Sequence, residues 1–169
     1  MKTLVAYATA HGSTRGVAER IAAQRKNSGD TVESMPVDEF VDPSAYDAVI
    51  IGSAVHNGQW LPEAVSAIER CRTRLAGKAV WTFSVSSIGA SSAIVSPAIA
   101  RLLRKVTPEP EAVEILRTVA DMRGHRFFAG AIAPGDWPGK GKIVFRLMGG
   151  KYGDARDWQD IDSWASSIR

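Results

Sequence analysis

The chain has a single cysteine among its 169 residues, which excludes an internal disulfide. This residue, Cys71, falls within a predicted helix, where we expect a structural thiol in a reducing compartment such as the cytoplasm. No apolar run approaches the roughly 20 residues that a membrane-spanning helix needs, and the N-terminus lacks the pattern of a secretory signal. The three histidines (His11, His56 and His125) are too widely spaced to indicate a metal site, and none is expected.

The chain also has no large excess of either positive or negative charge. Lys and Arg number 21 against 18 Asp and Glu, which gives a net charge of +3 and an isoelectric point near 9.2. This excess does not point to a nucleic-acid partner, and none is expected. It favours an acidic membrane or a carboxylate-bearing substrate over a basic redox partner, although simple solubility explains it equally well. Length and 45% hydrophobic content predict one domain over residues 1–169.

Two well-known phosphate-binding loops are missing as well. No stretch fits the Walker pattern, and Gly12 and Gly16 do not make the dinucleotide pattern G-x-G-x-x-G. Residues 9–14 instead read T-x-x-G-x-T, between an apolar strand at 3–8 and a helix at 14–26. A helix N-terminus offers free N–H groups and the positive end of its dipole to an anion, so this loop predicts a phosphate site. A hydroxyl-capped helix start without a ligand is the alternative.

The rest of the chain alternates strands and helices. Further strands are predicted at 31–37, 47–52, 78–86 and 126–132, and further helices at 62–77, 97–106, 111–122 and 156–168. This alternation predicts an α/β fold, a doubly wound five-stranded parallel sheet of order 2-1-3-4-5 with helices on both faces. Ligands of such sheets bind beyond the carboxyl ends of the strands. The loops at 9–14, 53–60 and 84–93 should therefore converge on one site.

These loops carry a family resemblance. The T-x-x-G-x-T loop resembles the phosphate loop of the flavodoxin family, which grips the phosphate of FMN. The segments MKTLVAYATAHGSTRGVAERIA and YDAVIIGSAVHNGQW, with the ending GGKYGDARDW…IDSWA, resemble flavodoxin-domain proteins of the menaquinone-dependent protoporphyrinogen IX dehydrogenase type. The resemblance implies FMN as cofactor and an oxidoreductase of haem biosynthesis that oxidises a porphyrinogen and passes electrons through flavin N5 to a quinone. The alternative is a non-enzymatic flavodoxin electron carrier serving a redox partner protein.

The same resemblance implies which residues hold FMN. The expected cofactor-binding residues are Thr9, His11, Gly12, Ser13 and Thr14; Ser53, Ala54, Val55, His56, Asn57, Gly58 and Trp60; and Ser84, Val85, Ser86, Ser87 and Gly89. His56 or Trp60 could cover one face of the flavin, although Trp60 could instead pack as a hydrophobic staple on the following helix. Asn57-Gly58 is a turn pair able to adopt positive φ, and its peptide could reach flavin N5. No catalytic residue is assigned.

Residues 134–151 are a candidate inserted loop. Basic residues flank a short apolar patch there: Lys140, Lys142, Arg146 and Lys151 lie beside Ile143, Val144, Phe145, Leu147 and Met148. Such a segment could contact the inner face of a membrane, a quinone or the propionates of a porphyrinogen. Plain packing on the domain is the favoured alternative.

Overall fold

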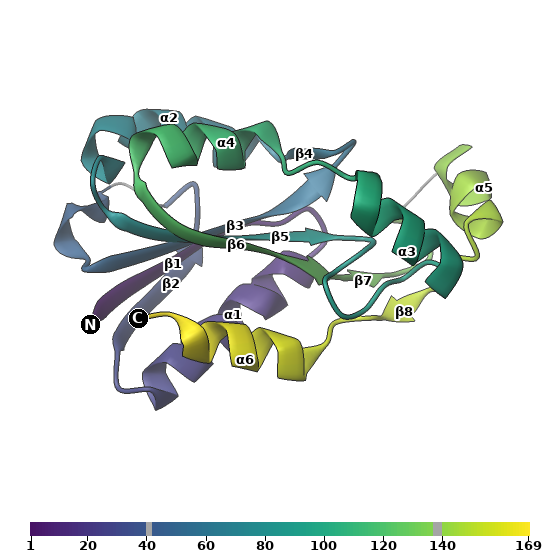
Figure 1. The fold of residues 1–169 in the computed structure, drawn as a ribbon, viewed down its shortest axis with the longest axis horizontal. Coiled ribbons are helices and arrows are strands. Elements are labelled where there is room, and N and C mark those ends of the chain that lie inside the picture. The colour runs from purple at the N-terminus through teal and green to yellow at the C-terminus, as the bar shows by residue number, and fades with distance from the viewer. Residues whose placement is uncertain (40–41, 137–139) are drawn as a thin grey trace.

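The computed structural model describes residues 1–39, 42–136 and 140–169. Its main strands are Lys2–Ala8 (β1), Thr31–Pro36 (β2), Ala48–His56 (β3), Ala79–Ser86 (β5) and Asp121–Ala129 (β6). They pair in the order β2-β1-β3-β5-β6, and every neighbouring pair among them is parallel (Figure 1). The predicted order is confirmed, because β3, β5 and β6 are the third, fourth and fifth strands of the prediction.

Helices cover both faces of this sheet. The longer helices are Ser13–Asn27 (α1), Pro62–Leu75 (α2), Pro97–Val106 (α3), Glu111–Val119 (α4), Lys140–Leu147 (α5) and Trp158–Ser167 (α6), with a short 3-10 turn at Pro43–Ala45. Helices α1 and α6 lie on one face and α2 and α4 on the other, whereas α3 and α5 lie beyond the carboxyl ends of the strands (Figure 1). Two short strands, Ala131–Ile132 (β7) and Gly153–Asp154 (β8), pair antiparallel there.

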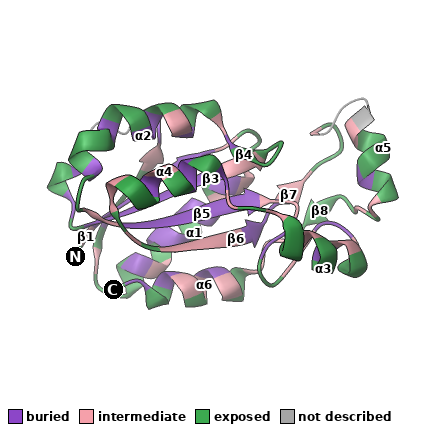
Figure 2. Ribbon diagram, turned by 45° about the horizontal axis from the view of Figure 1, so that its top comes forward, coloured by how far each residue is buried: buried purple, intermediate pink, exposed green. Residues whose placement is uncertain are grey.

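The central strands β1, β3 and β5 are mostly apolar because the sheet is buried on both faces there. Figure 2 shows the buried residues concentrated in the sheet and on the inner sides of the helices. One core includes Leu4 and Ile51 under α2 and α4, and the other includes Val5 and Ile50 under α1 and α6. Gly52 makes room for a ring in the second core, since a Cβ there would lie 2.1 Å from the Phe83 side chain.

The fifth strand begins and ends earlier in the chain than the sequence analysis predicts. The prediction of a helix to residue 122 and a strand from 126 to 132 was wrong, because α4 ends at Val119 and β6 runs from 121 to 129. Asp121 and Arg123, which form an ion pair, alternate at the start of this edge strand, where charged side chains can face solvent. The register of β6 also shifts between Val80 and Trp81 of β5. The end of β6 at Ala129 leaves residues 130–132 at the carboxyl edge of the sheet.

Residues 134–151 contain a helix rather than a plain loop. The side chain of Phe145 on α5 is fully buried, against Tyr152 and Gly150. On the same helix Ile143 and Leu147 are 62% and 82% exposed. Residues 137–139, within the candidate insertion, lie outside the described residues. This segment therefore combines packing on the domain with an exposed apolar surface.

Among the described residues, none of the helices is long and apolar enough to cross a bilayer. The same residues contain no group of three or more His, Cys, Asp or Glu side chains placed to hold a metal ion. Cys71 is buried in α2, and this burial raises the pKa of its thiol.

His125 on β6 gives the fold a pH dependence. Burial, together with the nearby charge of Arg117, lowers the pKa of its imidazole from 6.5 to about 4. The unfolded chain therefore binds more protons at this position than the folded chain between pH 6.5 and 4, and stability falls as the pH drops through this window. We expect wild type to lose about 2 kcal/mol more than His125→Gln between pH 7 and 4.5, measured by urea unfolding. Equal losses in the two proteins would contradict this.

Candidate functional site

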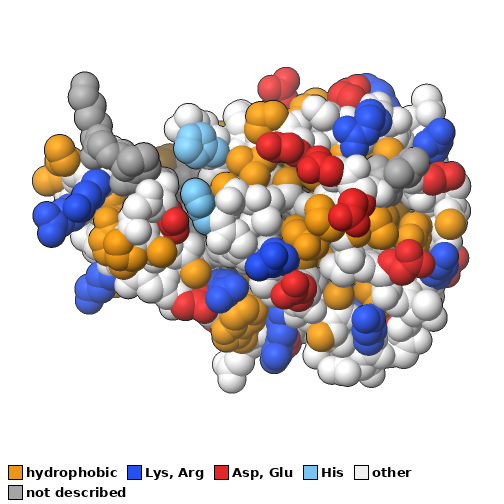
Figure 3. All heavy atoms as spheres, turned by 180° about the vertical axis from the view of Figure 1, so that it is seen from behind, with side chains coloured by type: hydrophobic (Ala, Val, Ile, Leu, Met, Phe, Trp, Pro, Cys, Tyr) orange, Lys and Arg blue, Asp and Glu red, His pale blue; other side chains and the backbone are white. Residues whose placement is uncertain are grey.

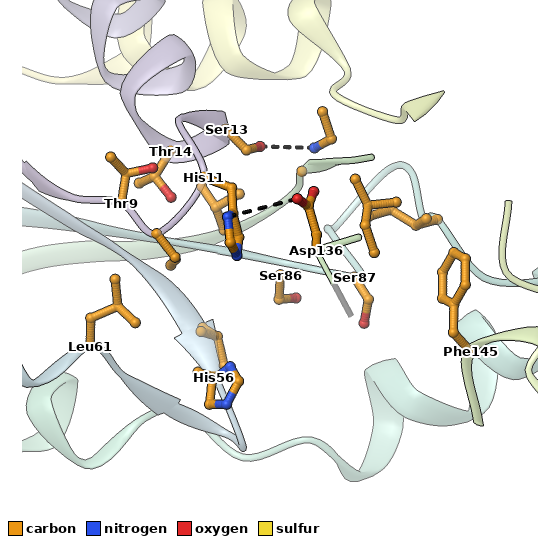
Figure 4. A pocket seen from close by; sticks show the side chains of 18 residues that line it. Thr9, His11, Ser13, Thr14, His56, Leu61, Ser86, Ser87, Asp136 and Phe145 are labelled. Atoms are coloured by element: carbon orange, nitrogen blue, oxygen red, sulfur yellow. Dashed lines mark hydrogen bonds and ion pairs between the residues drawn. The ribbon is translucent and has the colours of Figure 1, made fainter. Parts of the chain in front are cut away.

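A groove opens at the carboxyl edge of the sheet, where β1, β3 and β5 end (Figure 4). The lining residues come from all three predicted loops, from positions just outside two of them, and from the chain after β6. They are Thr9, Ala10, His11, Ser13, Thr14, Ala54, Val55, His56, Leu61, Val85, Ser86, Ser87, Ile94, Gly130, Ala131, Ile132, Asp136 and Phe145. The predicted convergence of the loops at 9–14, 53–60 and 84–93 is therefore present in the structure.

The start of α1 forms one wall of the groove. Gly12 precedes the helix with φ 86°, a left-handed conformation that glycine adopts without strain. Its N–H donates to Thr9 Oγ1 at 3.0 Å. Within the described part of the chain, no side chain caps the N–H groups of the first turn of α1. These groups are therefore free to bind a ligand.

Thr14 contributes a buried hydroxyl to this wall. Its side chain is 1% exposed, and its hydroxyl oxygen has no hydrogen-bond partner among the described residues. A buried hydroxyl without a partner costs about 1–3 kcal/mol. Because Thr14 lines the groove beside an uncapped helix N-terminus, an anion bound there would satisfy both sets of groups.

Ser13 ties this wall to the end of the sheet. Its Oγ accepts a hydrogen bond from Ala131 N–H at 2.8 Å (Figure 4). The neighbouring Gly130 allows this close approach, because a Cβ at that position would lie 2.8 Å from Ser13 Oγ. The hydroxyl hydrogens of Ser13 and Thr9 are left to donate, since both oxygens act as acceptors within the protein.

One acidic side chain lines the groove. Asp136 Oδ1 lies 3.7 Å from His11 Nδ1, and Asp136 Oδ2 accepts from Ala133 N–H at 2.7 Å. Figure 4 shows the two side chains facing each other, with His56 on the opposite side of the groove. The imidazole of His11 is mostly exposed and comes from the loop that precedes α1.

The loop after β3 is a tight hairpin. Asn57 and Gly58 have φ values of 51° and 79°, so the prediction of a positive-φ turn pair is confirmed. The turn joins β3 to a two-residue strand, Gln59–Trp60 (β4), which pairs antiparallel with it. This geometry leaves His56 exposed at the groove and places the Asn57-Gly58 peptide at the hairpin tip.

Trp60 points into the core. Its side chain is 3% exposed, and Nε1–H donates to Ser84 Oγ at 2.7 Å. Ser53 is likewise buried, and its Oγ accepts from Leu61 N–H at 3.0 Å. These three predicted site residues support the wall of the groove from behind. Gly89, also expected at the cofactor, lines a separate pocket on the far side of its loop.

Several groove residues were absent from the prediction. Leu61 and Ile94 come from positions just outside the predicted loops, and Gly130, Asp136 and Phe145 from the segment after β6. The late placement of the fifth strand concealed Gly130, which would otherwise have been the start of a fourth loop at this edge. No periodic signal places Phe145, because its position depends on the tertiary packing of α5.

Comparison with known sequences gives one family match and one group of low-identity relatives. A sequence model described as a flavodoxin domain matches residues 4–132. The chain is 21% identical over 179 residues to protoporphyrinogen IX dehydrogenase (quinone) of Escherichia coli strain K12, covering 99% of this chain and 94% of that one.

Solved structures share the fold at low identity. A short-chain flavodoxin associated with a PDU bacterial microcompartment aligns with TM-score 0.62 and 11% identity, over 99% of this chain and 96% of that one. Rubredoxin oxygen:oxidoreductase from Desulfovibrio gigas aligns with TM-score 0.61 and 16% identity over 99% of this chain, which spans only 35% of that longer protein.

Proposed function

Because the chain belongs to the flavodoxin domain family, whose cofactor is FMN, we propose that it is an FMN-dependent oxidoreductase that passes electrons to a quinone. The relative from Escherichia coli is named for a porphyrinogen and a quinone, which supports protoporphyrinogen IX as the substrate. The observation that carries the proposal is the groove itself, which combines an uncapped helix N-terminus with two further loops of the sheet edge.

The donor set of the first loop fits a phosphate group. We assign the phosphate to the first-turn N–H groups of α1 and to the hydroxyls of Thr9, Ser13 and Thr14. These donors carry no formal charge, so the dipole of α1 supplies the positive potential. The acidic side chain of Asp136 also lines the groove, and it opposes an anion at this position.

The remaining walls fit a flat, mostly apolar ring. Val55 and His56 at the end of β3 and Val85 and Ser86 at the end of the neighbouring strand β5 line the groove, with Phe145 farther along it (Figure 4). The groove is partly open rather than an enclosed cavity, so a ring system held here would keep part of its surface open to a second reactant. Bound FMN supplies the hydride or electron chemistry, while the protein fixes its orientation and limits the access of water.

The activity can be tested under anaerobic conditions. FMN-loaded protein would be mixed with protoporphyrinogen IX and a soluble naphthoquinone, and porphyrin fluorescence followed over time. We expect fluorescence to keep growing beyond the amount that one reduction of the bound FMN accounts for only when protein and quinone are both present. No gain over the protein-free control would overturn the enzyme assignment, and electron transfer to a redox protein without any to quinone would identify a carrier.

We also propose that α5 makes the peripheral membrane contact that a lipid-soluble quinone would require. Ile143, Val144 and Leu147 are at least half exposed, next to the exposed basic residues Lys142 and Arg146. Figure 3 shows hydrophobic and basic side chains side by side at this end of the molecule. Such a surface suits the headgroup region of anionic lipids.

Leu147→Ser is expected to weaken sedimentation with anionic vesicles about tenfold, because it removes the most exposed apolar side chain of α5. Leu102→Ser on α3 is the matched control, since that leucine is 57% exposed on another helix. Raising the salt concentration should weaken binding further. Equal effects of the two variants would show that α5 is not the contact.

A further inference from the structure

A second pocket lies behind the loop after β5, at the open edge of the sheet. Its walls come from this loop, from the end of α3 and from edge strand β6. We call it the edge pocket, and its residues are Ile88, Gly89, Ala90, Arg104, Thr107, His125, Arg126 and Phe127. None of them lines the groove described above. The pocket holds about 280 Å³, several times the roughly 30 Å³ that one water occupies, which is enough for a small organic molecule.

The ionised side chains of the edge pocket are both cationic. Arg126 is paired with Asp160, whose side chain is 11% exposed. Arg104 donates from Nε to Gly89 O at 2.7 Å and from Nη2 to Ser92 O at 2.9 Å. Both acceptors are neutral carbonyls, and no ion pair of Arg104 occurs among the described residues. A guanidinium has five N–H donors, so Arg104 keeps several for a ligand.

The other walls are largely apolar. Ile88, Ala90 and Phe127 contribute hydrocarbon surface, and Thr107 contributes a hydroxyl. The His125 ring packs edge-on against Phe127, with centroids 4.8 Å apart, and its Nδ1 lies 2.8 Å from Thr82 Oγ1. A ligand complementary to these walls has an apolar body and one anionic group.

We propose that the edge pocket binds a small organic acid, whose carboxylate is held by Arg104 and whose apolar body packs on Phe127 and Ile88. A carboxylate suits the planar fork of a guanidinium, which can donate two parallel hydrogen bonds. The ligand would lie behind the loop whose opposite side, through Ser86 and Ser87, lines the groove. The proposal is independent of FMN, because none of the groups that carry it belongs to the groove.

Benzoate is a suitable probe, because it joins a carboxylate to an apolar ring. Amide chemical shifts of the flavin-free protein would be followed during titrations with benzoate, benzyl alcohol and inorganic phosphate. We expect saturable benzoate binding with a Kd of about 1 mM, with shifts centred on Gly89, Ala90 and Phe127. Benzyl alcohol and phosphate should each bind at least about tenfold more weakly, since benzyl alcohol lacks the carboxylate and phosphate lacks the apolar ring.

Arg104→Met should weaken benzoate binding at least about tenfold, because it removes the charge and keeps much of the side-chain volume. Arg101→Met is the matched control on α3, and it should bind benzoate as wild type does. If Arg104→Met fails to fold, the comparison of benzoate with benzyl alcohol on wild type still decides. No saturable shift, equal binding of benzyl alcohol, or shifts centred on Thr9 and Ser13 would overturn the proposal.

Discussion

Replacing Asp30 by asparagine is expected to lower the free energy of unfolding by about 3–5 kcal/mol. The Asp30 carboxylate and the Arg25 guanidinium form a 2.8 Å ion pair, with both side chains 5% exposed. Arg25 also donates to the carbonyls of Ala165 and Ile168 at the end of α6. The substitution leaves a buried guanidinium without its counter-charge. Urea unfolding at pH 7 measures the loss.

The same two helices provide a control. Arg20 and Asp162 also join α1 to α6, at 2.6 Å, but their side chains are 49% and 27% exposed. Asp162→Asn should therefore cost no more than about 1 kcal/mol. Similar losses for Asp162→Asn and Asp30→Asn would show that burial does not determine the effect.

The buried pair of Asp30 and Arg25 also makes the stability of the fold depend on pH. Burial alone would raise the pKa of Asp30, but hydrogen bonds from Arg25, Thr3 and the amino group of Met1 outweigh it and lower the pKa. A carboxyl whose pKa is lower in the folded state stabilises the fold above its unfolded pKa, and this contribution is lost as the pH falls through the folded value. Asp30→Asn should remove this part of the acid sensitivity.

Thr14→Val is expected to weaken FMN binding about tenfold to a hundredfold, through the loss of a hydrogen bond to a charged group. The flavin-free protein should be equally stable or slightly more stable, because the substitution removes a buried hydroxyl that has no partner. Flavin fluorescence quenching measures the affinity, and thermal unfolding of the flavin-free protein measures the stability.

Ser13→Ala serves as the comparison for Thr14→Val. It removes the acceptor of Ala131 N–H, so it should lower both the stability of the flavin-free protein and the affinity for FMN. Unchanged FMN affinity in Thr14→Val would exclude that hydroxyl from the phosphate site. A marked loss of stability in the flavin-free variant would show that the hydroxyl has a structural partner instead.

The order of the sheet could be predicted because its evidence is local. Apolar strands such as β1 and β3 and the helices between them leave few topologies once crossovers are right-handed. The start of β6 could not be predicted in this way. Asp121 and Arg123 lie on an edge strand, where pairing on one side only permits a charged pattern that is unusual in a central strand.

The parts of the groove formed by loops that directly follow predicted strands could be predicted from the sequence. The glycine–hydroxyl loop and the Asn57-Gly58 turn have local signatures, and both occur at the predicted edge. Trp60 could have faced either the groove or the core. Its contact with Ser84 comes from the neighbouring strand and leaves no signal in sequence spacing. Asp136 and Phe145 depend in the same way on the packing of the segment after β6.

The most direct test of the phosphate site compares the affinities of the flavin-free protein for FMN and for riboflavin, which differ only by the phosphate. If the start of α1 and its hydroxyls hold that group, FMN should bind at least about a hundredfold more tightly. Equal affinities would contradict the assignment, and failure to bind either flavin would contradict the proposed function as a whole.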